Sequence, residues 1–259
     1  MIRALATAAS GMDAQQTRLD VTANNIANVS TPGFKKSRAE FQDLMYQTLR
    51  AAGAPQTNSP PMGLQVGMGV RTVTAQRMHT VGDQQQTGNQ FDVSIEGDGF
   101  FVVQMPNGEK AYTRAGNFHP NADGKLVTQD GHSLSSEITI PPNAESVTIG
   151  PDGVVTAAVK GDAQPVQVGK FELAHFVNPA GLTALGRNLF HETVASGQPI
   201  TGQPGEQSLG TLQQSSIELS NVKVVEEMVD LIAGQRAYEV NSKVIKAADE
   251  MLGQTANIR

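Results

Sequence analysis

Both ends of the chain carry apolar residues at alternating steps of three and four. Near the N-terminus the row is Ile2, Leu5, Ala9, Met12, Gln16, Leu19, Ala23 and Ile26. Near the C-terminus it is Val224, Met228, Leu231, Gln235, Tyr238, Ser242, Ile245, Asp249 and Leu252. This heptad spacing predicts two long amphipathic helices. Because either helix alone exposes its stripe, we expect the two ends to pack as a coiled coil on assembly, on each other or on neighbouring copies.

The C-terminal pattern is wider than a two-stranded coiled coil requires. Beside the heptad row runs a second apolar row of Val225, Val229, Ile232, Val240, Val244, Ala248 and Met251. Two adjacent apolar rows predict contacts with more than one neighbour. Ser220 and Asn221 precede the pattern, and both are residue types that cap helix starts. We therefore expect one of them to cap this helix.

The N-terminal helix is expected to end near Asn28. Thr31-Pro32-Gly33-Phe34 follows, with proline and glycine at the two central positions of a type II turn. Residues 32–72 are expected to form an extended connecting segment. Within it, a short amphipathic helix is expected from Phe41, Leu44, Met45 and Leu49. The stretch after that helix is rich in proline, glycine and small residues, which is typical of a flexible linker.

The pattern of residues 73–221 predicts short β-strands. Phe91 to Ile95 alternates between apolar and polar residues, and Gly99 to Val103 is the continuous apolar run of a buried strand. Asn107-Gly108 and Asp152-Gly153 separate strand-like runs, as hairpin turns do. We therefore predict an α+β chain. Residues 1–31 and 222–259 form its helical domain, and residues 73–221 form a central antiparallel all-β domain.

Composition and motifs argue against several classes of function. A formal net charge of −6 does not suit binding to nucleic acid. The absence of cysteine excludes disulfides and thiol catalysis. The histidines are too widely spaced for a helical metal pair, and no nucleophile motif is present. We expect no catalytic, cofactor-binding or metal-binding residues and no small-molecule substrate.

Three sets of residues resemble the axial proteins of the bacterial flagellum, the basal-body rod and hook family. The rod motif of that family resembles Ser10 to Gln16 and Asn24 to Lys35. Its shared β core is similar to Ile95 to Val103, Ala111 to Phe118 and Gly124 to Thr128. Its C-terminal helix resembles Leu219 to Val222, Glu226 to Val229 and Gln235 to Lys243. Together these stretches span nearly the whole chain.

The resemblance implies a structural protein and not an enzyme. Subunits of the rod stack helically into a hollow drive shaft that transmits motor torque to the hook, with the terminal helices inside and the β domain outside. The implied partners are further copies of the chain, proximal rod proteins, the hook protein, the P-ring and L-ring proteins and the flagellar type III export apparatus. The implied location is the basal body, between the periplasm and the outer membrane. Export without a cleaved signal peptide is expected, since Arg3 and Asp13 flank and interrupt the first apolar residues.

The heptad rows and the family motifs together give the residues expected at the assembly interface. They are Leu5, Met12, Leu19, Asn24, Asn25, Ile26, Asn28, Pro32, Gly33, Phe34, Met228, Leu231, Gln235, Arg236, Tyr238, Asn241, Ile245 and Leu252. Asp43 to Arg71 resembles the distal-rod branch of the family. In that branch the corresponding stretch implies a straightening segment, marked here by Tyr46, Pro55, Pro60, Pro61 and Leu64.

Other functions stay open at this point. Within the family, the alternatives are a proximal rod protein or a hook-type axial protein. Outside it, they are a coiled-coil scaffold of fixed small stoichiometry and a periplasmic hydrolase with helical dimerisation ends.

Overall fold

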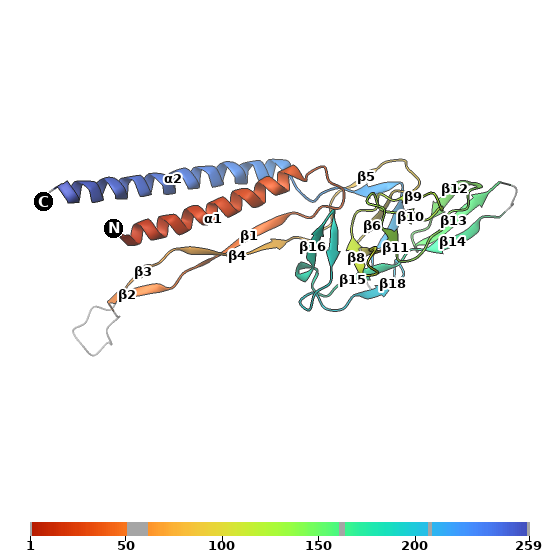
Figure 1. Ribbon diagram of the computed structural model, residues 1–259, viewed down its shortest axis with the longest axis horizontal. Coiled ribbons are helices and arrows are strands. Elements are labelled where there is room, and N and C mark those ends of the chain that lie inside the picture. The colour runs from red at the N-terminus through yellow and green to blue at the C-terminus, as the bar shows by residue number, and fades with distance from the viewer. Residues whose placement is uncertain (1, 51–61, 161–163, 207–208, 258–259) are drawn as a thin grey trace. The chain divides into compact units, whose positions relative to one another are not determined.

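The computed structural model describes residues 2–50, 62–160, 164–206 and 209–257 (Figure 1). The described residues fall into two compact units. The terminal unit is built from residues 1–27, 37–77 and 223–259, and the central unit from residues 28–36 and 78–222. Each unit is therefore assembled from segments that are distant in the sequence.

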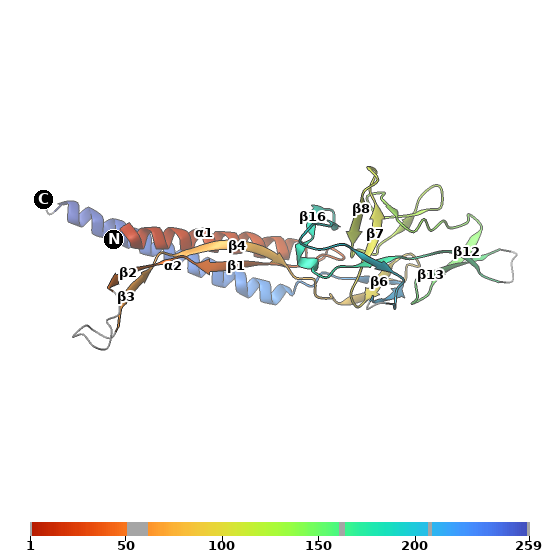
Figure 2. The same ribbon diagram turned by 90° about the horizontal axis from the view of Figure 1, so that it is seen from below.

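The terminal unit combines a pair of long helices with a β-ribbon. α1 (Ile2–Ala27) runs antiparallel to α2 (Val224–Asn257), and β1 (Ser37–Asp43) pairs antiparallel with β4 (Val70–Arg77). β2 (Tyr46–Arg50) and β3 (Leu64–Gly67) continue the ribbon. α1 contacts α2, β1 and β4. In Figure 1, α1 lies between α2 and the β-ribbon, and Figure 2 shows the ribbon running along α1. The predicted helices at both ends are confirmed. No helix in the described residues combines the length and apolar character needed to cross a membrane.

The short helix expected around Phe41 to Leu49 is wrong. Those residues lie in β1, in β2 and in the two-residue link between these strands. β1 pairs with β4 along its whole length, and β4 is rich in valine and threonine. In this ladder β1 and β4 hydrogen-bond to each other through their backbones, and both strands contact α1. The partner strand lies at residues 70–77, too far along the chain to be inferred from a short apolar pattern, so the local spacing was misleading.

The central unit is made of antiparallel sheets. In the described residues the order of the main path in the nine-stranded sheet is β16 (Thr183–Gly186), β17 (Leu189–His191), β8 (Lys110–Thr113), β7 (Phe100–Gln104), β11 (Ser133–Leu134), β10 (Leu126–Val127) and β9 (His119–Pro120). β7 also pairs with β15 (Leu173–His175), which pairs with β18 (Ile200–Gly202). A short 3₁₀ turn, η1 (Pro179–Gly181), precedes β16.

Smaller sheets complete the central unit. A three-stranded sheet contains β12 (Ala144–Ile149), β13 (Val154–Val159) and β14 (Val166–Lys170). Two further pairs join β6 (Val93–Glu96) to β19 (Thr211–Gln214) and β5 (Gln84–Gln86) to β20 (Ser216–Glu218). Every ladder among the described residues is antiparallel, as the sequence predicts.

β7 is the centre of the core because both of its faces are buried. Phe101 and Val103 point into the larger apolar cluster, where Phe101 meets Phe118 edge to face with ring centroids 5.1 Å apart. Phe100 and Val102 point into a second cluster with Tyr112 and other aromatic residues. The continuous apolar run is explained by this two-sided burial. Asn107-Gly108 forms the predicted turn between β7 and β8, with Gly108 at φ +84°.

The expected cap of α2 is wrong. α2 begins at Val224, after both candidate residues, and the hydroxyl of Ser220 accepts a hydrogen bond from the Val222 N–H. The Asn221 amide is engaged by other loops of the central unit, described below. Glu226 and Glu227 lie in the first turn of α2, where carboxylates interact favourably with the helix dipole.

Candidate assembly interface

The residues of α2 that pack on α1 form a heptad row. Every second member of this row lies one residue before the member that the apolar spacing predicts. Its members are Glu227, Leu231, Gly234, Tyr238, Asn241, Ile245, Ala248 and Leu252, with Tyr238 at the exposed edge. Leu231, Tyr238, Ile245 and Leu252 were expected there, and Asn241 was expected through the family motif. Met228, Gln235 and Arg236 lie outside this row and are exposed.

The shift has a physical reason. Apolar spacing favoured Met228 over Glu227, but the Glu227 carboxylate is held by Asn25 of α1. Gly234 and Ala248 are small, so their side of α2 approaches α1 closely, whereas a longer side chain would hold the helices apart. Small size and polar pairing at the contact therefore outweighed apolar character.

α1 buries a similar mixture of residues against its neighbours. Its buried residues are Ala8, Ala14, Thr22 and Asn25, while the expected Leu5, Met12, Leu19 and Ile26 are half-buried. Asn24, also expected in the interface, is exposed. The helix pair is thus held by few large apolar contacts within one chain.

Asn25 joins three elements of the terminal unit. Its Nδ2 donates to the Ser37 carbonyl at 2.9 Å, and its Oδ1 accepts from the Ser37 N–H at 2.9 Å. The same Nδ2 donates to Oε2 of Glu227 at 3.1 Å. The buried side chain therefore bonds to the start of β1 as a neighbouring strand would, and it ties α1 to α2.

A second row on α2 remains exposed in the chain. Its apolar residues are Val225, Val229, Ile232, Val240, Val244 and Met251, each at least 43% exposed. Except for Ala248, which is buried against α1, this is the second row that the sequence predicts. Contiguous exposed apolar side chains are typical of surfaces that bind other proteins.

The turn after the N-terminal motif has the expected form. Gly33 has φ +69°, and the Phe34 N–H donates to the Thr31 carbonyl at 3.2 Å, closing the turn. The Asn28 carbonyl accepts from the Thr31 N–H. Pro32 is tied down through its carbonyl, which accepts from Nδ2 of Asn188 at 3.1 Å. A Cβ at Gly33 would lie 2.6 Å from the Ala115 backbone nitrogen, so only glycine fits.

Beside this turn lies a buried charged cluster of Lys35, Arg114 and Glu218. Lys35 Nζ donates to Oε1 of Glu218 at 2.5 Å, and Arg114 Nε donates to Oε2 at 2.5 Å. The three side chains are at most 4% exposed. The Gly82 N–H also donates to the carboxylate, and the remaining guanidinium donors reach carbonyls of the 95–99 segment. Every charge in the cluster is therefore paired, as burial requires.

The protonation of the cluster follows from these contacts. Burial raises the pKa of the Glu218 carboxyl, but the two cations and the Gly82 N–H outweigh burial and hold that pKa below its usual range. Burial lowers the pKa of the Lys35 ammonium, and the Glu218 carboxylate offsets this only in part. The Glu218 carboxylate is the group that pairs with both buried cations, so the cluster needs it to be ionised.

Asn221 fastens the same region of the central unit. Its Oδ1 accepts from the Lys36 N–H at 2.7 Å, and its Nδ2 donates to the Met78 carbonyl at 2.9 Å and to Oγ1 of Thr80 at 2.9 Å. Sequence reasoning missed Lys35, Arg114, Glu218 and Asn221 as a set. A charge or amide at a strand end looks the same in sequence whether it is solvated or buried, so its partners cannot be inferred.

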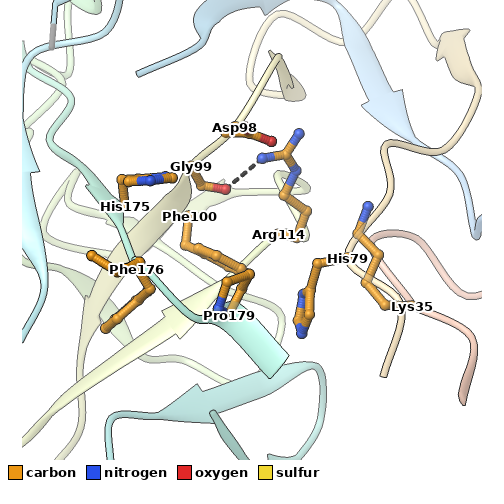
Figure 3. A pocket seen from close by; sticks show the side chains of 10 residues that line it. Lys35, His79, Asp98, Gly99, Phe100, Arg114, His175, Phe176 and Pro179 are labelled. Atoms are coloured by element: carbon orange, nitrogen blue, oxygen red, sulfur yellow. Dashed lines mark hydrogen bonds between the residues drawn. The ribbon is translucent and has the colours of Figure 1, made fainter. Parts of the chain in front are cut away.

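A cavity of about 250 Å³ lies next to the cluster (Figure 3). Its lining includes Lys35, Arg114 and His79 together with the rings of Phe100 and Phe176. His79 packs edge-on against Phe100, with ring centroids 5.6 Å apart, and Figure 3 shows Arg114 directed to the Gly99 carbonyl. In the described part of the chain, no three histidine, aspartate or glutamate side chains are grouped to hold a metal ion. The cations beside the cavity are committed to Glu218.

The expected straightening segment is described only at its ends. Tyr46 and Leu64 begin β2 and β3, and each is about half exposed, at 56% and 51%. Pro55, Pro60 and Pro61 lie outside the described residues. The described part of the segment is therefore a paired ribbon with exposed apolar side chains.

Comparisons with known proteins identify three matching family regions. Residues 5–35 match the flagella basal body rod protein family, residues 94–157 match the flagellar hook protein FlgE/F/G D1 domain, and residues 213–258 match the flagellar basal body rod FlgEFG protein C-terminal region. The chain is 47% identical to flagellar basal-body rod protein FlgG of Borreliella burgdorferi over 100% of the chain and 99% of that protein.

Other relatives agree over their full length. Flagellar basal-body rod protein FlgG of Caulobacter vibrioides is 48% identical, and that of Bacillus subtilis is 40% identical, each over 100% of both chains. The chain belongs to the flagellar basal-body rod protein family. Within it, the chain resembles the FlgG proteins, which corresponds to the distal-rod branch expected from the sequence. This is a family of structural proteins of the flagellum, not of enzymes, and the place of the rod protein is the basal body.

Proposed function

We propose that this rod protein is a subunit of the distal rod that polymerises helically into a hollow drive shaft carrying motor torque to the hook. The observation that carries the proposal is the exposed apolar row on α2. One face of α2 is occupied by α1 of the same chain, and the row lies on another face. A helix with one internal partner and a second apolar row requires a further neighbour, and in a homopolymer that neighbour is another copy.

The mixed character of the α1–α2 contact supports the same reading. A torque-bearing shaft needs many parallel contacts between copies. This helix pair buries small and polar side chains within the chain and leaves large apolar side chains exposed. Those apolar side chains are therefore available for contacts between copies. The proposed interface therefore includes the exposed Met228 and Arg236 as well as the row, since they lie beside it.

The further partners follow from position in the basal body. The proposed neighbours along the axis are proximal rod proteins and the hook protein, and those around it are the P-ring and L-ring proteins. The proposed route is the flagellar type III export apparatus, without a cleaved signal peptide. The names of the relatives support the basal body as the location, and the order of neighbours is part of the proposal.

Electron microscopy of concentrated purified protein tests the polymer directly. Tubular polymers are expected, whereas a closed dimer or trimer would favour a coiled-coil scaffold. Val229→Lys places a charge in the exposed row and is expected to abolish polymers while the soluble chain keeps its helical circular dichroism and melting. Val194→Lys is the matched control, because it makes the same substitution at a fully exposed valine of the central unit, away from α2. Polymers that form equally well with both variants would contradict the proposal.

A further inference from the structure

We propose that two glycines, one on each helix, act as reciprocal notches that fix the antiparallel register of α1 on α2. A Cβ built at Gly234 of α2 would lie 3.0 Å from a terminal methyl carbon of Leu19 on α1. A Cβ built at Gly11 of α1 would lie 3.1 Å from Nδ2 of Asn241 on α2. Each helix therefore inserts one side chain into a gap left by a missing side chain on the other.

Glycine in a helix interior needs such a packing reason. It weakens a helix relative to alanine because it loses more backbone freedom on folding. At Gly234 the gap is bounded on two sides, since Oε1 of Gln15 lies 3.9 Å from the same built Cβ. Leu19 thus fills a space with little room for an added methyl group.

Heptad patterns alone do not set this register. A slide of one heptad brings equivalent apolar positions back into contact, so the alternatives differ little in buried area. The notches distinguish the observed register from these alternatives. After such a slide Leu19 would face Asn241 or Glu227 in place of Gly234, and the longer side chain would hold the helices apart.

Two polar contacts agree with the same register. Arg18 donates to Asp230 at 2.7 Å, and Asn25 donates to Glu227 at 3.1 Å. The first pair is largely exposed, so it contributes little to stability. The steric fit at the two glycines is therefore the stronger determinant along the middle of the helix pair. If the proposed function holds, the register also sets the height at which every copy presents its exposed apolar row.

Alanine substitutions test the notches against a matched control. Gly253 of α2 is the control, because a Cβ there would meet nothing within 4 Å. By helix propensity alone, alanine stabilises all three sites. We expect Gly253→Ala to raise the melting midpoint of the helices by about 2–4 °C, and Gly11→Ala and Gly234→Ala to lower it by a similar amount. Leu19→Ala is expected to restore part of the loss in Gly234→Ala, and Asn241→Ala part of the loss in Gly11→Ala.

Cross-linking reads the register without requiring a polymer. The chain has no cysteine, so Arg18→Cys with Asp230→Cys gives a single reactive pair for a short thiol cross-linker in the soluble protein. The yield is expected to fall several-fold on adding Gly11→Ala or Gly234→Ala and to stay unchanged with Gly253→Ala. Equal yields with a higher melting midpoint in all three variants would overturn the notches, as would a parent pair that fails to cross-link. Loss of polymers with an intact cross-link would instead count against the proposed function alone.

Discussion

At the scale of single residues, buried polar side chains do the positioning that apolar patterns cannot. Glu218 binds Lys35 and Arg114, which lie 183 and 104 residues away. Asn25 binds Glu227 from 202 residues away. A buried donor or acceptor that loses its partner is costly, so such contacts allow few alternative arrangements. Each of them selects one pairing among segments that apolar contacts alone would hold loosely.

Glu218→Gln is expected to destabilise the central unit. Two cations would remain buried without a carboxylate, which costs about 3–5 kcal/mol and lowers the melting midpoint by roughly 6–20 °C. Glu137→Gln is the control, because Glu137 meets Lys125 on the surface with 73% of its side chain exposed. Thermal unfolding followed by circular dichroism in the β region measures both. A Glu218→Gln melt within a degree of wild type would show that the cluster is dispensable.

The same cluster predicts a loss of stability in acid. The folded-state pKa of Glu218 is depressed below its ordinary value of 4.5. Its contribution is therefore complete above the unfolded pKa and is lost as the pH falls through the lower folded pKa. The difference in unfolding free energy between wild type and Glu218→Gln should be constant near neutral pH and should shrink below about pH 4. Urea unfolding of both proteins across this range gives the measurement, and a difference independent of pH would contradict it.

At the scale of elements, α2 has two distinct working faces. One packs on α1 through small and polar residues, and the other presents a row of valine, isoleucine and methionine to solvent. Leu231 belongs to the first face and Ile232 to the second, although they are adjacent in sequence. A substitution on the first face should therefore change the chain itself, and one on the second should change only contacts between copies.

Leu231→Asp is expected to weaken the helix pair. The half-buried leucine would be replaced by a charge facing α1, at a cost of about 2–3 kcal/mol. Helical circular dichroism and its melting should fall in the soluble protein, polymers should not form and swimming should be lost, while the central unit melts as in wild type. Ala233→Asp introduces the same charge at an exposed position nearby, so it should leave the soluble chain unchanged. Normal swimming of the Leu231→Asp strain would refute the expectation.

At the scale of the whole molecule, three distant parts of the chain meet in the central unit. The Thr31 to Phe34 turn, the segment around Arg114 and the strand β20 with Glu218 form one buried contact set. The family regions found by comparison include parts of all three. The ribbon of β1 to β4 belongs instead to the terminal unit. We therefore expect that the ribbon can affect the curvature of the polymer and that the central unit folds without it.

Deleting residues 46–63 tests the straightening role. As a tether the stretch could be shortened at little cost, because loop-closure free energy changes slowly with length. As a wedge between copies, its removal should leave polymers that form but curve or flex like a hook. Imaging basal bodies purified from the deletion strain decides between the two, and straight rods of normal stiffness would favour the tether.

The structure offers a cleaner version of the same deletion. The Leu44 N–H donates to the Gly69 carbonyl at 2.8 Å, so the ribbon can be closed at this point. Replacing residues 45–68 by an Asn-Gly turn removes β2 and β3 together and leaves β1 and β4 paired. Both deletions should give the same curved polymers, because neither of them retains the pair of β2 and β3. Curvature in the first deletion alone would point to its unpaired β3.

The sequence by itself determined the features whose causes are local. Helices at both ends follow from heptad periodicity, and the Thr31 to Phe34 and Asn107-Gly108 turns follow from residues that favour special backbone angles. The buried run of β7 was also readable, because two-sided burial leaves a continuous apolar signature. The presence of a second apolar row on α2 was visible in the same way.

Only the tertiary structure decided how these elements meet. Periodicity predicted a row on α2 in which every second residue differs by one position from the row that packs on α1. The reason is that Glu227 and Gly234 pack there through contacts with Asn25 and Leu19 on the other helix. β1 became a strand because β4 supplied its hydrogen bonds, and Glu218 became the centre of a buried cluster because two cations from distant segments reached it. Local sequence fixes backbone preferences within a few residues, whereas burial, pairing and close approach depend on partners that the chain brings together only on folding.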